Sequence, residues 1–125
     1  MNTQEVTHNG VTILEVLPGE DGTRLSKEQD ALDLIGELAG YEANRLLIHY
    51  GALSEDFFNL RTGLAGALML KWSMYRIATA AVIPTEIASE GRFGEMVLET
   101  NRRKSREFRV FATREEALDW LSGGH

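Results

Sequence analysis

Residues 44–83, NRLLIHYGALSEDFFNLRTGLAGALMLKWSMYRIATAAVI, decide how this chain folds. The segment begins with a short apolar run, Arg45–His49, and ends with a second one, Ile77–Ile83. Both runs have the length and composition of buried strands. About 20 residues with helical spacing lie between them, which is enough for the crossover that joins two parallel strands. The stretch therefore predicts a strand–helix–strand unit.

We expect a single helix over residues 54–73. Ser54 is a suitable N-cap, and the acidic pair Glu55 and Asp56 suits the positive end of the helix dipole. The apolar positions that recur at helical spacing are Phe57, Leu60, Leu64, Leu68 and Trp72. This face should be buried against the sheet.

Two glycines, Gly63 and Gly66, fall inside this predicted helix. A glycine in a helix interior costs about 1 kcal/mol relative to alanine, so a compensating reason is needed. We favour a close approach of the helix to the sheet or to a neighbouring helix. The alternative is a backbone that contacts a ligand.

The chain on the N-terminal side predicts a hairpin, a loop and a helix. Asn9-Gly10 separates the β-like runs Glu5–His8 and Val11–Val16, and this dipeptide is typical of a type I′ turn. Leu17–Arg24 is a loop rich in glycine and acidic residues. The helix that follows should start with a capping box formed by Ser26 and Gln29, run to about Ala39 and end at Gly40 as a left-handed C-cap.

The C-terminal third predicts a helix, a strand and a helix after Pro84, which ends the preceding strand. The first helix is expected from about Ser89 to Asn101, with Asn101 as a left-handed terminus. Phe108–Phe111 is the last strand. Thr113 and Glu116 form a capping box for the closing helix.

The predicted order of elements is ββαβαβαβα. Strands that alternate with helices indicate an α/β sandwich with a mixed sheet, parallel in its core and antiparallel at the N-terminal hairpin. The length of 125 residues suits one domain over residues 1–125, with residues 122–125 frayed.

Composition excludes several classes of function. The net charge of −6 argues against nucleic acid as the main partner. The absence of cysteine removes disulfides, thiolate nucleophiles and cysteine metal sites. The N-terminus lacks the features of a signal peptide, and no apolar run reaches the length of a membrane span, so the cytoplasm is the expected location.

Residues that could carry chemistry are few. The three histidines, His8, His49 and His125, lack the spacing of a metal site, and we expect neither a metal nor a cofactor. His49 ends a buried strand, where open α/β sheets place ligands. One alternative is therefore a small enzyme that uses His49 with Ser54 or Asp56. The structural alternative is that His49 packs as a hydrogen-bonded residue and Ser54 caps a helix.

A local basic segment, Arg102–Arg106, has two interpretations. It could meet an acidic partner, a nucleic acid or a membrane surface. The interpretation we favour is a solvated helix end whose cations complement the helix dipole.

Four blocks carry a resemblance to a known family. They are ALDLIGEL (31–38), SEDFFNLRTGLAGALMLKWSMYRIATAAVI (54–83), EMVLETNR (95–102) and FRVFATREEALDWL (108–121). Together they resemble the bacterial domain-of-unknown-function family numbered 4180, and the SEDFF–LRTGLAG block is the most specific part. The resemblance implies a fold similar to STAS (sulphate-transporter and anti-sigma-factor-antagonist) and SpoIIAA-like domains.

In STAS-like proteins an Asp-Ser-Ser-Gly-Leu element carries a serine that a partner kinase phosphorylates. The nearest equivalent in this chain is Asn59–Leu64, in which Thr62-Gly63-Leu64 keeps the hydroxyl, glycine and leucine. Asn59 stands in place of the aspartate, and the first serine is missing. The resemblance therefore implies binding of a partner or ligand through the helix that carries Thr62.

The hypothesis that the sequence favours is a non-catalytic binding or regulatory module, with a protein partner or small ligand and no membrane. The residues proposed for the binding surface are Arg61, Thr62, Gly63, Glu99 and Asn101. A third alternative is homodimerisation through an exposed apolar strip that contains Trp72 or Met74.

Overall fold

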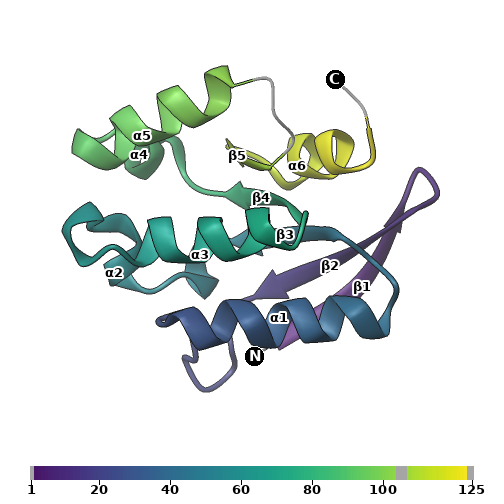
Figure 1. Cartoon of the computed structure of the whole chain (residues 1–125). Helices are drawn as coiled ribbons and strands as arrows, with labels where there is room; N and C mark the ends of the chain where they lie inside the picture. Colours follow the sequence, from purple (N-terminus) through teal and green to yellow (C-terminus); the bar gives the residue numbers. More distant parts are fainter. Residues whose placement is uncertain (1, 104–106, 124–125) are drawn as a thin grey trace.

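The computed structural model describes residues 2–103 and 107–123 (Figure 1). Its centre is a five-stranded sheet in which the strands lie in chain order. They are β1 (Asn2–His8), β2 (Val11–Leu17), β3 (Arg45–His49), β4 (Ala78–Val82) and β5 (Phe108–Phe111). β1 and β2 are antiparallel, and the remaining neighbours are parallel. The predicted α/β fold with a mixed, mainly parallel sheet is confirmed.

Helices cover the two faces of the sheet unequally (Figure 1). The helical elements are α1 (Glu28–Gly40), η1 (Tyr50–Ala52), α2 (Glu55–Phe58), η2 (Leu60–Thr62), α3 (Leu64–Met74), α4 (Thr85–Ala88), α5 (Gly91–Arg102) and α6 (Arg114–Leu121). Leu46 and Ile48 enter the larger core beneath α1, α3 and α5, whereas Leu47 enters the smaller core beneath α6. Successive strand residues point to opposite faces, so β2, β3, β4 and β5 each contribute to both cores.

The predicted N-terminal hairpin is confirmed. β1 and β2 pair in register from Asn2 with Leu17 to His8 with Val11. Asn9 and Gly10 have φ values of 50° and 78°, the positive values that a type I′ turn requires at both positions.

The start of α1 differs from the predicted capping box. The helix begins at Glu28 rather than directly after Ser26. Its first turn is stabilised by the carboxylate of Asp30, which accepts the backbone N–H groups of Ser26 and Lys27 at 2.8 and 3.2 Å. An aspartate inside the first turn thus replaces the predicted serine cap.

Both predicted left-handed helix ends are wrong. Gly40 is the last residue of α1, and the positive φ of 53° falls on Glu42. Asn101 lies inside α5. The helix predicted from Ser89 begins at Gly91, whose φ of 57° separates it from α4.

The central helix predicted over 54–73 is wrong, because the segment forms α2, η2 and α3. The Asn59 side chain accepts the backbone N–H of Arg61 at 3.2 Å, which gives the chain an alternative to continuous helical bonding. Gly63 then has a φ of 76°, and α3 begins at the next residue. The predicted burial of the apolar face is confirmed except at Leu60, which is partly buried, since Phe57 and Leu68 are fully buried and Leu64 is 9% exposed.

The predicted reason for the two glycines is also wrong. A Cβ atom added at Gly63 or Gly66 would meet no atom within 4 Å. Gly63 is needed for its left-handed conformation, whereas Gly66 lies on the exposed side of α3. The predicted exposed strip includes Met74 but not Trp72, which is 1% exposed.

Other local predictions hold. Pro84 ends the sheet after β4, and Phe108–Phe111 forms β5. The hydroxyl of Thr113 accepts the backbone N–H of Glu116, as the predicted capping box requires. Residues 104–106 of the basic segment and residues 124–125 of the tail lie outside the described residues.

Candidate binding groove

A cavity of about 470 Å³ lies where the chain leaves β3 and β4. It is lined by Tyr50, Glu55, Phe58, Asn59, Leu60, Arg61, Ile87, Glu90, Gly91, Arg92 and Phe93, and we name it the aromatic cavity. These residues belong to η1, α2, η2, α4 and the start of α5, together with the residues that join them. Open α/β sheets bind ligands at the carboxyl ends of their strands, so the position is one where a ligand site is expected.

The wall of the aromatic cavity is built from rings that pack tilted or edge to face. Phe58 lies with its ring centroid 5.2 Å from Tyr50 and 5.0 Å from Phe93. The neighbouring Phe57 is fully buried and contacts the rings of Phe58 and Phe93 from the core side. Because Phe57 fixes the two rings, the cavity has an apolar surface that is held in place by the core.

A second cavity of about 500 Å³ adjoins the first. It shares Leu60, Arg61 and Arg92 with the aromatic cavity and adds Glu95, Met96 and Glu99. We name the two cavities together the groove. Arg61 and Arg92 therefore lie along both parts of the groove, one from η2 and the other from the first turn of α5.

The predicted binding residues fall into two groups in the structure. Arg61 lines both cavities, and Glu99 lines the second, where it also forms an ion pair with Arg103 at 3.0 Å. The hydroxyl of Thr62 lies 2.6 Å from the carbonyl oxygen of Asp56 and accepts the N–H of Leu64 at 3.2 Å. Thr62 thus stabilises the turn that presents Arg61.

Asn101 lies apart from the groove and pairs with strand β5. Its side-chain nitrogen donates to the carbonyl oxygen of Val110, and its side-chain oxygen accepts the N–H of Val110, both at 3.0 Å. β5 is the last strand of the sheet, so these are the bonds that a further strand would make. The side chain of Asn101 therefore closes the open edge of β5.

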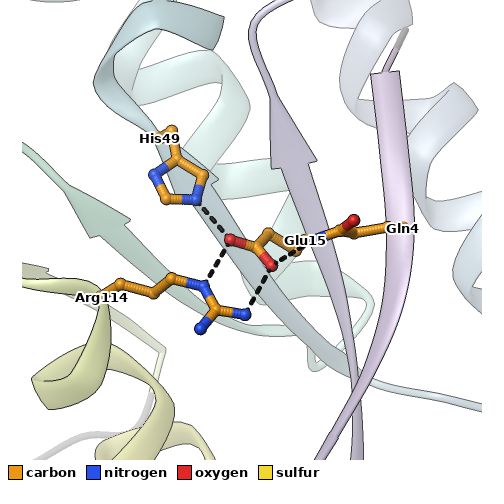
Figure 2. Close-up of polar contacts among 4 residues, drawn as sticks. All are labelled: Gln4, Glu15, His49 and Arg114. Atoms are coloured by element: carbon orange, nitrogen blue, oxygen red, sulfur yellow. Dashed lines mark hydrogen bonds and ion pairs between the residues drawn. The ribbon is translucent and has the colours of Figure 1, made fainter.

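A polar cluster that sequence reasoning missed surrounds Glu15 in β2 (Figure 2). The side chain of Glu15 is 1% exposed, and three side chains hold its carboxylate. Arg114 binds both oxygens, with distances of 2.8 Å from Nε and 2.9 Å from Nη2. His49 Nε2 lies 2.5 Å from Oε2, and Gln4 donates to Oε1 at 2.8 Å.

The cluster keeps a buried carboxylate ionised. Burial alone raises the pKa of Glu15, because it disfavours the charged form. The hydrogen bonds from Arg114, His49 and Gln4 outweigh burial and lower the pKa from 4.5 to about 2. The hydrogen bonds to Glu15 also raise the pKa of Arg114. The only signal in the sequence was an acidic residue inside the apolar run Ile13–Leu17.

Residues 8–121 match the family model described as Domain of unknown function (DUF4180). The chain belongs to this family. The match covers the whole groove and, in the Glu15 cluster, every residue except Gln4. Comparisons with curated proteins and with solved structures find no match to this chain.

In this DUF4180 chain, His49 forms no hydrogen bond with Ser54 or Asp56, the residues of the alternative enzyme site, among the described residues. His49 contacts Glu15, whereas the buried Ser54 hydroxyl has no hydrogen-bond partner among the described residues. The side chain of Asp56 has no hydrogen bond to either residue within the described ranges. A hydroxyl nucleophile beside a histidine base is therefore not assembled in this arrangement.

Within residues 2–103 and 107–123, no group of three or more acidic or histidine side chains is arranged to hold a metal ion. In the same part of the DUF4180 chain, no helix is both long enough and apolar enough to cross a bilayer.

Proposed function

We propose that this DUF4180 chain is a non-catalytic binding or regulatory module that works through the groove. The observation that carries the proposal is the aromatic cavity, whose volume of about 470 Å³ is within the range of small-molecule sites. It combines an apolar wall with a few polar groups, the composition that orients a bound ligand. Phe58 and Phe93 already contact the buried Phe57, so ordering these two rings would cost little on binding.

In this proposal the predicted residues have separate roles. Arg61 contacts the bound molecule directly, and Glu99 borders the second cavity. Thr62 and Gly63 shape the turn from which Arg61 projects, as the hydrogen bonds of Thr62 and the positive φ of Gly63 support. Asn101 contributes indirectly, by stabilising the edge of the sheet beside α5.

We propose further that the domain is STAS-like and works in the bacterial cytoplasm. Thr62-Gly63-Leu64 lies at the start of α3, where a STAS-like switch carries its hydroxyl, and this position supports the likeness. The lack of cysteine and the net charge of −6 support a soluble protein of a reducing compartment.

A thermal-shift screen of small metabolites tests the proposed surface. Ligands that bind the folded state raise the melting temperature by mass action. Leu60→Trp fills the groove, because Leu60 lines both cavities. Leu98→Trp is the matched control, since Leu98 is 60% exposed and lies outside the groove. We expect compounds that stabilise the unmodified protein to lose their effect on the Leu60 variant alone. Equal stabilisation of both variants would contradict the proposal.

A second candidate function is self-association through the outer side of α3. Leu70 and Met74 are 59% and 62% exposed and lie one helical turn apart, and the adjacent Tyr75 is 53% exposed. Contiguous exposed apolar side chains are typical of protein contacts. Light scattering over a range of concentrations tests this candidate, and an apparent mass that stays monomeric throughout would exclude it.

A further inference from the structure

The residues that line the aromatic cavity include two of each charge. The acidic residues are Glu55 and Glu90, and the basic residues are Arg61 and Arg92. All four residues are exposed. Within the described part of the chain, no ion pair or side-chain hydrogen bond engages any of these four charged groups.

Opposite charges around one cavity would gain by meeting. Some charged side chains elsewhere do pair, as Lys71 does with Glu28 at 3.1 Å and Arg103 with Glu99 at 3.0 Å, whereas Arg24 has no partner among the described residues. Around the aromatic cavity the four charged residues form no ion pair within the described part of the chain. Groups of both signs are therefore free to bind a molecule between them.

We propose that the aromatic cavity binds a free α-amino acid with a large apolar side chain, an inference that rests on the proposed function of the groove. Arg61 and Arg92 bind its carboxylate, since guanidinium groups recognise carboxylates with paired hydrogen bonds. Glu55 and Glu90 bind its ammonium group. The side chain of the amino acid packs on Phe58 and Phe93, which lie 5.0 Å apart.

The chemistry favours the free amino acid over a simple acid, a simple amine or a peptide segment. A monofunctional acid or amine would leave one pair of these charges without a partner. A residue inside a peptide has lost both charges to amide bonds. Only a free amino acid presents a carboxylate and an ammonium group on one carbon, beside its side chain. The volume of about 470 Å³ holds such a molecule.

Three probes that differ by one group at a time test the inference: L-phenylalanine, 3-phenylpropionate, which lacks the amine, and phenethylamine, which lacks the carboxylate. Each is titrated into the 15N-labelled full chain, with the amide signals of Gly91 and Phe93 as reporters of the cavity. We expect the dissociation constant of L-phenylalanine to be at least tenfold lower than that of either analogue. Equal constants for the three probes, or no shift at these reporters, would overturn the inference.

Two variants, each of which removes one charge, separate the binding of the carboxylate from the binding of the ammonium group. Arg61→Gln should weaken L-phenylalanine binding at least fivefold and leave phenethylamine binding unchanged. Glu90→Gln should weaken L-phenylalanine by a similar factor and leave 3-phenylpropionate unchanged. Arg24→Gln, in an exposed loop outside the groove, is the matched control and should change nothing. A variant that weakens all three probes equally, or none of them, would also overturn the inference.

The result distinguishes this inference from the proposed function beneath it. Shifts at Gly91 and Phe93 with all three probes at similar affinity would keep the groove as a binding surface and reject the zwitterionic ligand. Groove-dependent hits of another chemical class in the thermal-shift screen, with no L-phenylalanine binding, would do the same. Failure of both experiments would reject both proposals.

Discussion

Glu15 and Arg114 are 99 residues apart in sequence and form two parallel hydrogen bonds of 2.8 and 2.9 Å. Glu15 belongs to β2, and Arg114 is the first residue of α6. The pair therefore links α6, which covers the less covered face of the sheet, to β2, the second strand in the order β1-β2-β3-β4-β5. His8 and Asp119 add a contact of 2.8 Å between β1 and the same helix.

Arg114→Met should destabilise the protein by about 2–4 kcal/mol, because it leaves the buried Glu15 carboxylate without its main partner. Urea denaturation measures the change. Arg24→Met is the matched control for losing an exposed arginine that has no partner among the described residues, and it should be nearly neutral. The double variant Glu15→Gln, Arg114→Met should recover part of the loss, since it removes the unpaired charge. A single variant as stable as the control would show that the pair contributes little.

Stability should fall with acid as Glu15 is protonated. Its pKa is about 2 in the folded state and 4.5 as its ordinary value, so the unfolded chain takes up the proton first. The contribution is complete above pH 4.5 and is lost as the pH falls toward 2, with a total of about 3 kcal/mol. Urea denaturation at several pH values measures this slope. Arg114→Met should flatten it, and an equal slope in both proteins would assign the acid sensitivity to other carboxylates.

The parts of the fold that sequence predicted depend on local chemistry. Asn9-Gly10 makes its turn through its own backbone preferences, and Thr113 caps α6 through a residue three positions away. The sequence did not predict that residues 54–74 divide into α2, η2 and α3, because the apolar residues have nearly the same spacing in one continuous helix as in these three elements. The decisive feature is the φ of 76° at Gly63, which a glycine inside an apolar helix does not reveal by itself.

The candidate site was only half predictable for a similar reason. Arg61 lies in a distinctive block of sequence, and it does line the groove. Arg92 faces the same cavity from α5 and carries no local signal, because packing of α5 brings it there. Glu15 was not predicted, because its partners His49 and Arg114 are 34 and 99 residues away in sequence.

Gly63 and Gly66 should respond oppositely to alanine. Gly63→Ala forces a Cβ into a left-handed conformation and should destabilise the protein by about 1 kcal/mol. Gly66→Ala adds a methyl group to an exposed helical position with open space around it, and it should stabilise by about 0.5–1 kcal/mol. Paired thermal denaturation measures the difference. Equal effects at the two positions would mean that residues 60–66 form the continuous helix that the structure replaces with η2 and α3.

Asn101→Ala should destabilise the protein by about 2 kcal/mol and promote association. The variant removes both hydrogen bonds to Val110, each with a net contribution of about 1 kcal/mol. It also exposes an N–H and a C=O on the last strand of the sheet, where another chain can pair. Urea denaturation measures the first effect and light scattering the second.

Asn101→Asp is the matched control for this position. One carboxylate oxygen still accepts the N–H of Val110, but the other faces the Val110 carbonyl oxygen, to which the Asn101 amide donated, and the two acceptors repel each other. We therefore expect a loss of stability at least as large as in the alanine variant, with less association because the charge opposes pairing with another chain. An aspartate variant as stable as the unmodified protein would mean that the bond donated by Asn101 contributes little. An alanine variant that stays monomeric at high concentration would show that the remainder of the chain already protects the edge of β5.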